Sequence, residues 1–82
     1  MIASAQISVY PLRQERFGPA VQAVQTSLAE HGLVPAVGAM STTVVGEDAV
    51  LFAALRDAFA KSAESGQVVM TITVSNACPI PD

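Results

Sequence analysis

Apolar and polar residues alternate at the start of the chain, which predicts a β-strand over residues 2–10. One side of this strand is apolar: Ala3, Ala5, Ile7 and Val9. The other side is polar and uncharged: Ser4, Gln6, Ser8 and Tyr10. A strand face in contact with water usually carries charged residues for solubility. The uncharged outer face therefore calls for an explanation.

Three-to-four-residue spacing predicts a first helix over residues 19–31. Val21, Val24 and Leu28 form its apolar stripe. Pro19 suits the first helical turn, and Gly32 suits the left-handed residue that follows the last turn.

A second helix is predicted over residues 48–64, with Gly66 after its end. Its predicted apolar face consists of Phe52, Leu55 and Phe59, with Leu51 and Ala58 beside them. Glu47 and Asp48 complement the positive end of the helix dipole, which explains this carboxylate pair without any catalytic role.

Three further strands are expected, over residues 33–37, 40–45 and 68–75, with Gly38-Ala39 connecting the first two. Pro35 cannot donate a ladder hydrogen bond, so its strand belongs at a sheet edge. The order βαββαβ gives two right-handed crossovers that share one hairpin.

This order predicts an α+β, ferredoxin-like fold. Its antiparallel sheet has the strand order 4-1-3-2, both helices lie on one face, and the Pro35 strand lies at an edge. One domain is expected over residues 1–79, followed by a short tail at 80–82.

None of the predicted strands contains Asp, Glu, Lys or Arg. The helices cover only one sheet face, so the other is left with Ser, Thr, Gln and Tyr. Three explanations are open: a solvated face, a face buried against a second copy, or a small-molecule site. A combination of the last two is favoured, because neutral groups avoid the cost of burying charge.

Composition supports burial against another chain. The chain has 82 residues, of which 51% are hydrophobic, and its mean hydropathy is +0.47. Small domains have the most surface per residue, so such an apolar one is expected to bury surface in an assembly. No apolar run is long enough to span a membrane, no signal peptide is expected, and the single cysteine, Cys78, fits a reducing cytoplasm.

Charge and motifs exclude several functions. The net charge is −3, and the four basic residues form no stripe, which disfavours nucleic-acid binding. There is no nucleotide-binding motif and no cluster of metal ligands, so no metal or cofactor is expected. Cys78 has no base assigned to it, since the only histidine, His31, falls at a helix end. An enzyme is therefore not expected.

Three segments, "SAQISVYPL", "GAMSTTVVG" and "VVMTITVSNACP", resemble the YkoF-like family of thiamine- and hydroxymethylpyrimidine-binding proteins. The resemblance covers nearly the whole chain, up to about Pro79. It implies a ferredoxin-like fold, ligand binding without catalysis, and association of two such units. Some family members carry two repeats in one chain. This chain has one, so the resemblance implies a homodimer, or a homotetramer like those that related domains form through their sheets.

The polar residues of these segments suit an aminopyrimidine, which offers ring-nitrogen acceptors and an amino donor. Amide side chains could pair with its edge, hydroxyls could meet single positions, and an aromatic ring or a thioether could pack on its face. The candidate ligand-binding residues are Gln6, Ser8, Tyr10, Met40, Ser41, Thr43 and Asn76. The absence of Lys and Arg from the predicted sheet disfavours phosphorylated ligands.

Sheet geometry limits this set. Asn76 follows the last strand and is expected beside the start of the first, whereas Tyr10 is expected near Ser41. Six strand residues at about 3.4 Å each separate the two ends by roughly 20 Å. One small ligand cannot reach both within a subunit, and the Tyr10 end is favoured. The alternative function is a structural or regulatory homo-oligomerisation module without a dedicated ligand.

Overall fold

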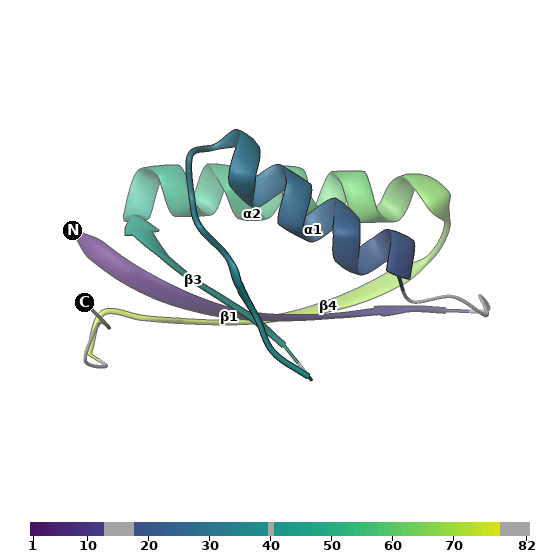
Figure 1. Ribbon diagram of the computed structural model, residues 1–82, viewed down its shortest axis with the longest axis horizontal. Helices are drawn as coiled ribbons and strands as arrows, with labels where there is room; N and C mark the ends of the chain where they lie inside the picture. Colours follow the sequence, from purple (N-terminus) through teal and green to yellow (C-terminus); the bar gives the residue numbers. More distant parts are fainter. Residues whose placement is uncertain (13–17, 40, 78–82) are drawn as a thin grey trace.

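The computed structural model describes residues 1–12, 18–39 and 41–77. Its elements are β1 (Ile2–Pro11), α1 (Gly18–Glu30), β2 (Ala36–Val37), β3 (Thr42–Glu47), α2 (Asp48–Ser62), a 3-10 turn η1 (Ala63–Ser65) and β4 (Val68–Ser75). Figure 1 shows both helices on the same side of the sheet.

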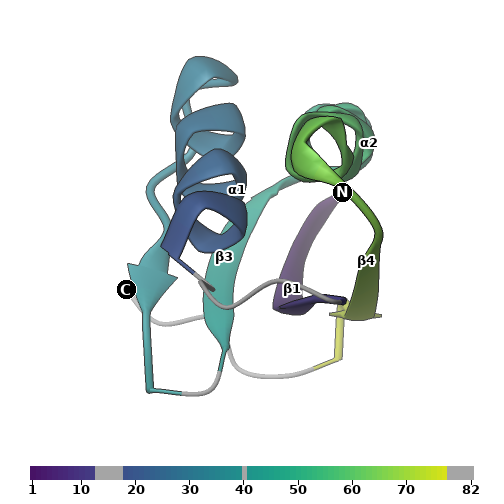
Figure 2. The same ribbon diagram turned by 90° about the vertical axis from the view of Figure 1, so that its right-hand side faces the viewer.

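The sheet has the strand order β2-β3-β1-β4, and all neighbouring strands are antiparallel. This confirms the predicted ferredoxin-like α+β fold. In Figure 2, α1 lies over the β3 side of the sheet, and α2 lies over the β1 and β4 side.

The core lies between the helices and the apolar side of β1. Ala3, Ala5 and Ile7 are buried there, as the alternation predicts. Alanine at two of these positions leaves space for the helices to approach the sheet closely. The remaining buried apolar residues come from both helices and β3: Ala20, Val24, Leu28, Val44, Leu51, Ala54, Leu55 and Ala58.

A glycine ends α1. Gly32 has a φ of 77°. Its N–H donates to the Ala29 carbonyl at 2.9 Å, and the Leu33 N–H donates to the Leu28 carbonyl at 3.0 Å. These two bonds form a Schellman motif, which satisfies carbonyls at the end of the helix. The chain then turns back toward the sheet and enters β2.

Two ion pairs link α1 to α2. The His31 Nε2 lies 2.7 Å from the Asp57 Oδ2, and the Lys61 ammonium lies 3.6 Å from the Glu30 carboxylate. The hydrogen bond from His31 is the largest cause that holds the pKa of the Asp57 carboxyl below its ordinary value. Asp57 and Lys61 therefore mark the side of α2 that faces α1.

Several predicted boundaries are wrong. β2 has only two residues, so Pro35 precedes the strand, although β2 does lie at the sheet edge. β3 extends through Glu47, which gives the sheet one charged residue at its border, so the expectation of strands without charge fails there. α2 ends at Ser62, and η1 follows it.

The predicted apolar face of α2 is also partly wrong. Phe52 and Phe59 are 55% and 48% exposed, while Leu51, Leu55 and Ala58 are buried. Apolar residues occur around most of the circumference of this helix. The spacing of apolar residues along the sequence therefore does not determine which side of the helix faces the sheet.

Replacing Gly32 with alanine should destabilise the protein, because a Cβ is strained at this positive φ. We expect Gly32→Ala to lower the free energy of unfolding by about 1 kcal/mol. Gly18→Ala is the matched control, since a Cβ there meets no atom within 4 Å. Its effect should stay within about 0.5 kcal/mol in urea denaturation. Equal losses for the two variants would contradict the role of Gly32.

The Asp57–His31 pair should make stability depend on pH. A carboxyl with a depressed folded pKa stabilises the fold above its unfolded pKa, about 3.9, and this contribution is lost as pH falls through the folded pKa. Asp57→Asn should therefore lower the melting temperature near neutral pH, and the difference from wild type should shrink in acid. Glu64→Gln removes an exposed carboxyl from η1, which follows α2, and serves as the control. A pH-independent Asp57→Asn difference would contradict the pairing.

Candidate functional site

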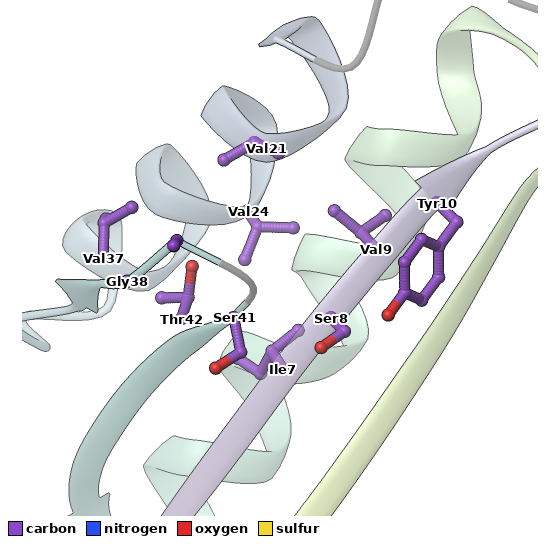
Figure 3. Close-up of a pocket in the computed structure, with 11 residues that line it drawn as sticks. Ile7, Ser8, Val9, Tyr10, Val21, Val24, Val37, Gly38, Ser41 and Thr42 are labelled. Atoms are coloured by element: carbon purple, nitrogen blue, oxygen red, sulfur yellow. The ribbon is translucent and has the colours of Figure 1, made fainter.

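A cavity of about 360 Å³ lies between α1, the second half of β1, and the β2–β3 connection. Its lining residues are Ile7, Ser8, Val9, Tyr10, Val21, Val24, Val37, Gly38, Ala39, Ser41 and Thr42. Figure 3 shows Val24 and Val9 directed toward each other across the space between α1 and β1. A small organic ligand fits a space of this size.

The cavity wall is mainly apolar, with a few hydroxyl groups. Valines of α1 and β1 face it from the helix side of the sheet, while Ser8 and Tyr10 belong to the open side of β1. Ser41 and Thr42 come from the start of β3. No charged residue is among the described lining residues, so this environment suits an uncharged or weakly polar ligand group.

The cavity lies where the described partners of β1 extend to different points. In the part of the chain that the structure describes, the β1–β3 pairing reaches Ile7↔Thr42, whereas the β1–β4 pairing continues to Pro11↔Val68. Among the described residues, the stretch beyond Ile7 is therefore flanked by β4 on one side and borders the cavity on the other.

The direction of the β1 backbone follows from two hydrogen bonds at its ends. The Leu12 N–H donates to the Gln67 carbonyl at 2.8 Å, and the Asp48 N–H donates to the Met1 carbonyl at 2.9 Å. Antiparallel ladders alternate strictly, so even-numbered residues of β1 direct their main-chain groups to β4 and odd-numbered residues direct theirs to the β3 side. The N–H and C=O of Val9 therefore point to the cavity side.

The β2–β3 connection is closed by a hydrogen bond from the Gly38 N–H to the Ser41 carbonyl at 2.8 Å. A Cβ at Gly38 would lie 3.1 Å from that same carbonyl oxygen, so a glycine allows the close approach. The Ser41 hydroxyl accepts a hydrogen bond from the Gln6 Nε2 at 3.2 Å. This bond connects the open face of β1 to the cavity rim.

The structure brings together part of the predicted site. Ser8, Tyr10 and Ser41 line the cavity. Gln6 contacts it through Ser41, and Thr43 lies opposite Gln6 in the β1–β3 register on the open face. Met40 lies outside the described residues.

Asn76 does not belong to this group. Its Nδ2 donates to the Met1 Sδ at 3.1 Å, beside the start of β1. Ser4↔Ser75 is the last pair of β1 and β4 at that end of the sheet. This placement agrees with the expectation that Asn76 and Tyr10 lie at opposite ends.

Sequence reasoning missed the helix-side wall of the cavity. Val21 and Val24 belong to the predicted apolar stripe of the first helix, and Thr42 is absent from the predicted site. Their periodicity is that of ordinary core positions, so the pattern carried no signal that a void lies beside them.

Register assigns the open sheet face. Residues paired across strands share a face, so the even-numbered residues of β1 share the open face with the odd-numbered residues of β3 and β4. Its uncharged polar members in the strands are Ser4, Gln6, Ser8, Tyr10, Thr43, Thr71, Thr73 and Ser75. Glu47, at the border, pairs with the amino group of Met1.

The described part of the chain contains no group of three or more side chains able to hold a metal ion. Within the same residues, no helix is long and apolar enough to cross a membrane.

The fold and the cavity together define a small ferredoxin-like domain with a neutral pocket. The family model of thiamine-binding proteins matches residues 5–77, and the chain belongs to this family. This match confirms the resemblance to the YkoF-like proteins. No curated protein gives a significant match.

Solved structures share the fold. A hypothetical protein of Methanocaldococcus jannascii has a TM-score of 0.84 and 17% identity, covering 98% of this chain and 84% of its own. A Streptococcus pneumoniae protein has a TM-score of 0.81 and 23% identity, covering 92% and 86%. A Thermotoga maritima protein, described as a candidate thiamine biosynthesis/salvage protein, has a TM-score of 0.78 and 17% identity, covering 90% and 82%.

Proposed function

We propose that the protein binds unphosphorylated thiamine or its hydroxymethylpyrimidine moiety, without catalysis, in the cavity beside Tyr10. The observation that carries this proposal is a neutral cavity of about 360 Å³ in a chain of the thiamine-binding protein family. The Thermotoga maritima neighbour, described in terms of thiamine biosynthesis or salvage, adds support. The lone cysteine favours the cytoplasm as the place of binding.

The cavity offers matched groups for an aminopyrimidine. The Val9 N–H and C=O form a donor–acceptor pair that suits a ring nitrogen and an exocyclic amino group. The Ser41 hydroxyl accepts a hydrogen bond from Gln6 and can donate to a further polar position of the ligand. Ser8 borders the same cavity.

Charge explains the preference for an unphosphorylated ligand. Phosphate binding favours Lys, Arg or a cluster of N–H donors, and none of the described lining residues is basic. A catalytic role is disfavoured as well, since His31, the only histidine, is held against Asp57 on the helix layer. Ligand binding without catalysis therefore accounts for the lining residues of the cavity.

Calorimetry with thiamine, hydroxymethylpyrimidine and thiamine pyrophosphate tests the proposal. We expect heat from at least one unphosphorylated ligand and weaker binding of the pyrophosphate. Folded protein that gives no heat with any of the three would refute ligand binding and favour an oligomerisation module.

Filling the cavity should abolish binding while leaving the fold intact. Val21 is half-buried on the cavity wall, so Val21→Phe places a ring in the ligand space. We expect the dissociation constant to rise at least tenfold, about 1.4 kcal/mol. Val34→Phe adds the same ring at a position that is 85% exposed and outside this lining, and it should bind as wild type does. Equal affinities for the two variants would show that the ligand does not bind in this cavity.

We further propose that the open sheet face is buried against a second copy, in a homodimer or homotetramer. Its uncharged side chains support this proposal. In an isologous interface the same patch of both subunits is in contact, and uncharged side chains do not repel each other there. This face is separate from the helix-side wall of the cavity.

Thr73→Lys tests this assembly, since Thr73 lies on the open face in register with Gln6. A buried face would lose several kcal/mol of association free energy, whereas a solvated face would change by about 0.5 kcal/mol or less. Light scattering should show fewer copies per particle for this variant. Gln22→Lys adds the same charge on the exposed side of α1 and is the control. If the particle mass of Thr73→Lys equals that of the wild type, the open face is exposed to solvent and not buried against a second copy.

A further inference from the structure

We infer that Thr42 is a specificity-determining residue of the cavity, because its hydroxyl requires a polar atom on the part of the ligand that lies beneath α1. The inference rests on the proposed function and deepens it. It assigns a ligand class, which is a flat, neutral heterocycle whose buried side carries one hydrogen-bonding atom. A hydrocarbon ring of the same shape should be rejected.

Thr42 lies on the helix side of the sheet. It pairs with Ile7 in the β1–β3 ladder, and Ile7 belongs to the core. Residues paired across strands share a face, so the Thr42 side chain points to the same side. Figure 3 shows its oxygen directed toward the side of the sheet on which α1 lies. The threonine therefore occupies a position at which an aliphatic residue is expected.

The Thr42 hydroxyl has no hydrogen-bond partner among the described residues. Thr42 is 5% exposed, and none of the side-chain hydrogen bonds in that part of the chain includes it. Ser62 shows the contrast, since its buried hydroxyl donates to the Phe59 carbonyl at 3.0 Å. A buried hydroxyl without a partner costs free energy, which a valine of the same shape would avoid. A threonine kept at such a position points to a function.

The Thr42 oxygen is reached through the cavity. No side-chain nitrogen or oxygen in the described segments is both sealed from solvent and without a partner. Since the Thr42 oxygen has no partner, it must be accessible, and Thr42 lines the cavity. A molecule in the cavity is therefore the partner that completes its hydrogen bonding.

The groups around Thr42 define what the ligand presents there. The other helix-side residues of β1 and α1 that line the cavity are aliphatic: Ile7, Val9, Val21 and Val24. Because Thr42 pairs with Ile7, Val9 is its diagonal neighbour across the ladder, about 7–8 Å away. A single small ring can contact both, with apolar atoms against the valines and one polar atom at Thr42. A hydroxyl donates or accepts, so a ring nitrogen and a hydroxymethyl group both qualify.

Thermal unfolding of the ligand-free protein tests whether the hydroxyl lacks a partner. Thr42→Val removes the hydroxyl and keeps the shape, so its melting temperature should equal or exceed that of the wild type. Thr26→Val makes the same exchange at an exposed position of α1 outside the cavity lining and is the control. A melting temperature of Thr42→Val several degrees below that of Thr26→Val would show that the hydroxyl already has a partner. That result would overturn the inference whatever the protein binds.

Calorimetry measures the role of Thr42 in binding, with thiamine and hydroxymethylpyrimidine as the ligands. We expect Thr42→Val to raise the dissociation constant of the bound ligand at least about tenfold, because the polar atom of the ligand is then buried without a partner. Thr42→Ser keeps the hydroxyl and should restore most of the affinity. Thr26→Val should bind as the wild type does.

Analogues that each lack one polar group identify the ligand atom at Thr42. In these compounds one ring nitrogen is replaced by C–H, or the amino group or the hydroxyl of hydroxymethylpyrimidine is replaced by hydrogen. Thr42→Val should weaken binding of every analogue except the one that lacks the atom in contact with Thr42. An equal loss for all analogues, or no loss for either parent ligand, would overturn the inference while the proposed function stands. Wild-type protein that binds neither parent ligand would refute the proposed function together with the inference.

Discussion

The central strand β1 is the constraint on which the rest of the structure depends. It pairs with β3 as far as Ile7 and with β4 as far as Pro11, and these ladders assign the direction of each residue's backbone and side chain. Its odd-numbered side chains form the floor of the core, where Ala3 and Ala5 let two helices lie close to the sheet. Its even-numbered side chains form the open face. The cavity begins where β3 ends its pairing with β1, at Ile7↔Thr42.

The charged side chains lie away from the surfaces for which we propose binding. The pairs His31–Asp57 and Glu30–Lys61 connect the two helices. The described cavity lining and β4 carry no charge at all. The proposed ligand binding and self-association would therefore use hydroxyls, main-chain groups and apolar contact, which suit an aminopyrimidine and also a second copy of the chain. The absence of charge suits both ligand binding and self-association, because burying a neutral surface avoids the desolvation cost of a charged group.

The size of the domain explains why so much apolar surface remains outside the core. A chain of 82 residues has a high ratio of surface to volume, and a two-layer fold covers only one face of its sheet. Phe52, Phe59, Ile72 and Val74 remain partly exposed. A larger domain would bury such side chains internally.

The sequence by itself determined the order of elements, the sheet topology and the two faces of β1 and β4, because strand alternation and glycine stops are local rules. It also brought Ser8, Tyr10 and Ser41 to one end of the sheet and placed Asn76 at the other. Tertiary structure alone decided the rotation of α2, because a helix that is apolar around most of its circumference has several arcs able to face a core. Packing against α1 buried Leu51 and Leu55 and left Phe52 and Phe59 outside. It also decided the cavity, since a void depends on how α1, β1 and the β2–β3 connection pack together, and no residue pattern records that packing.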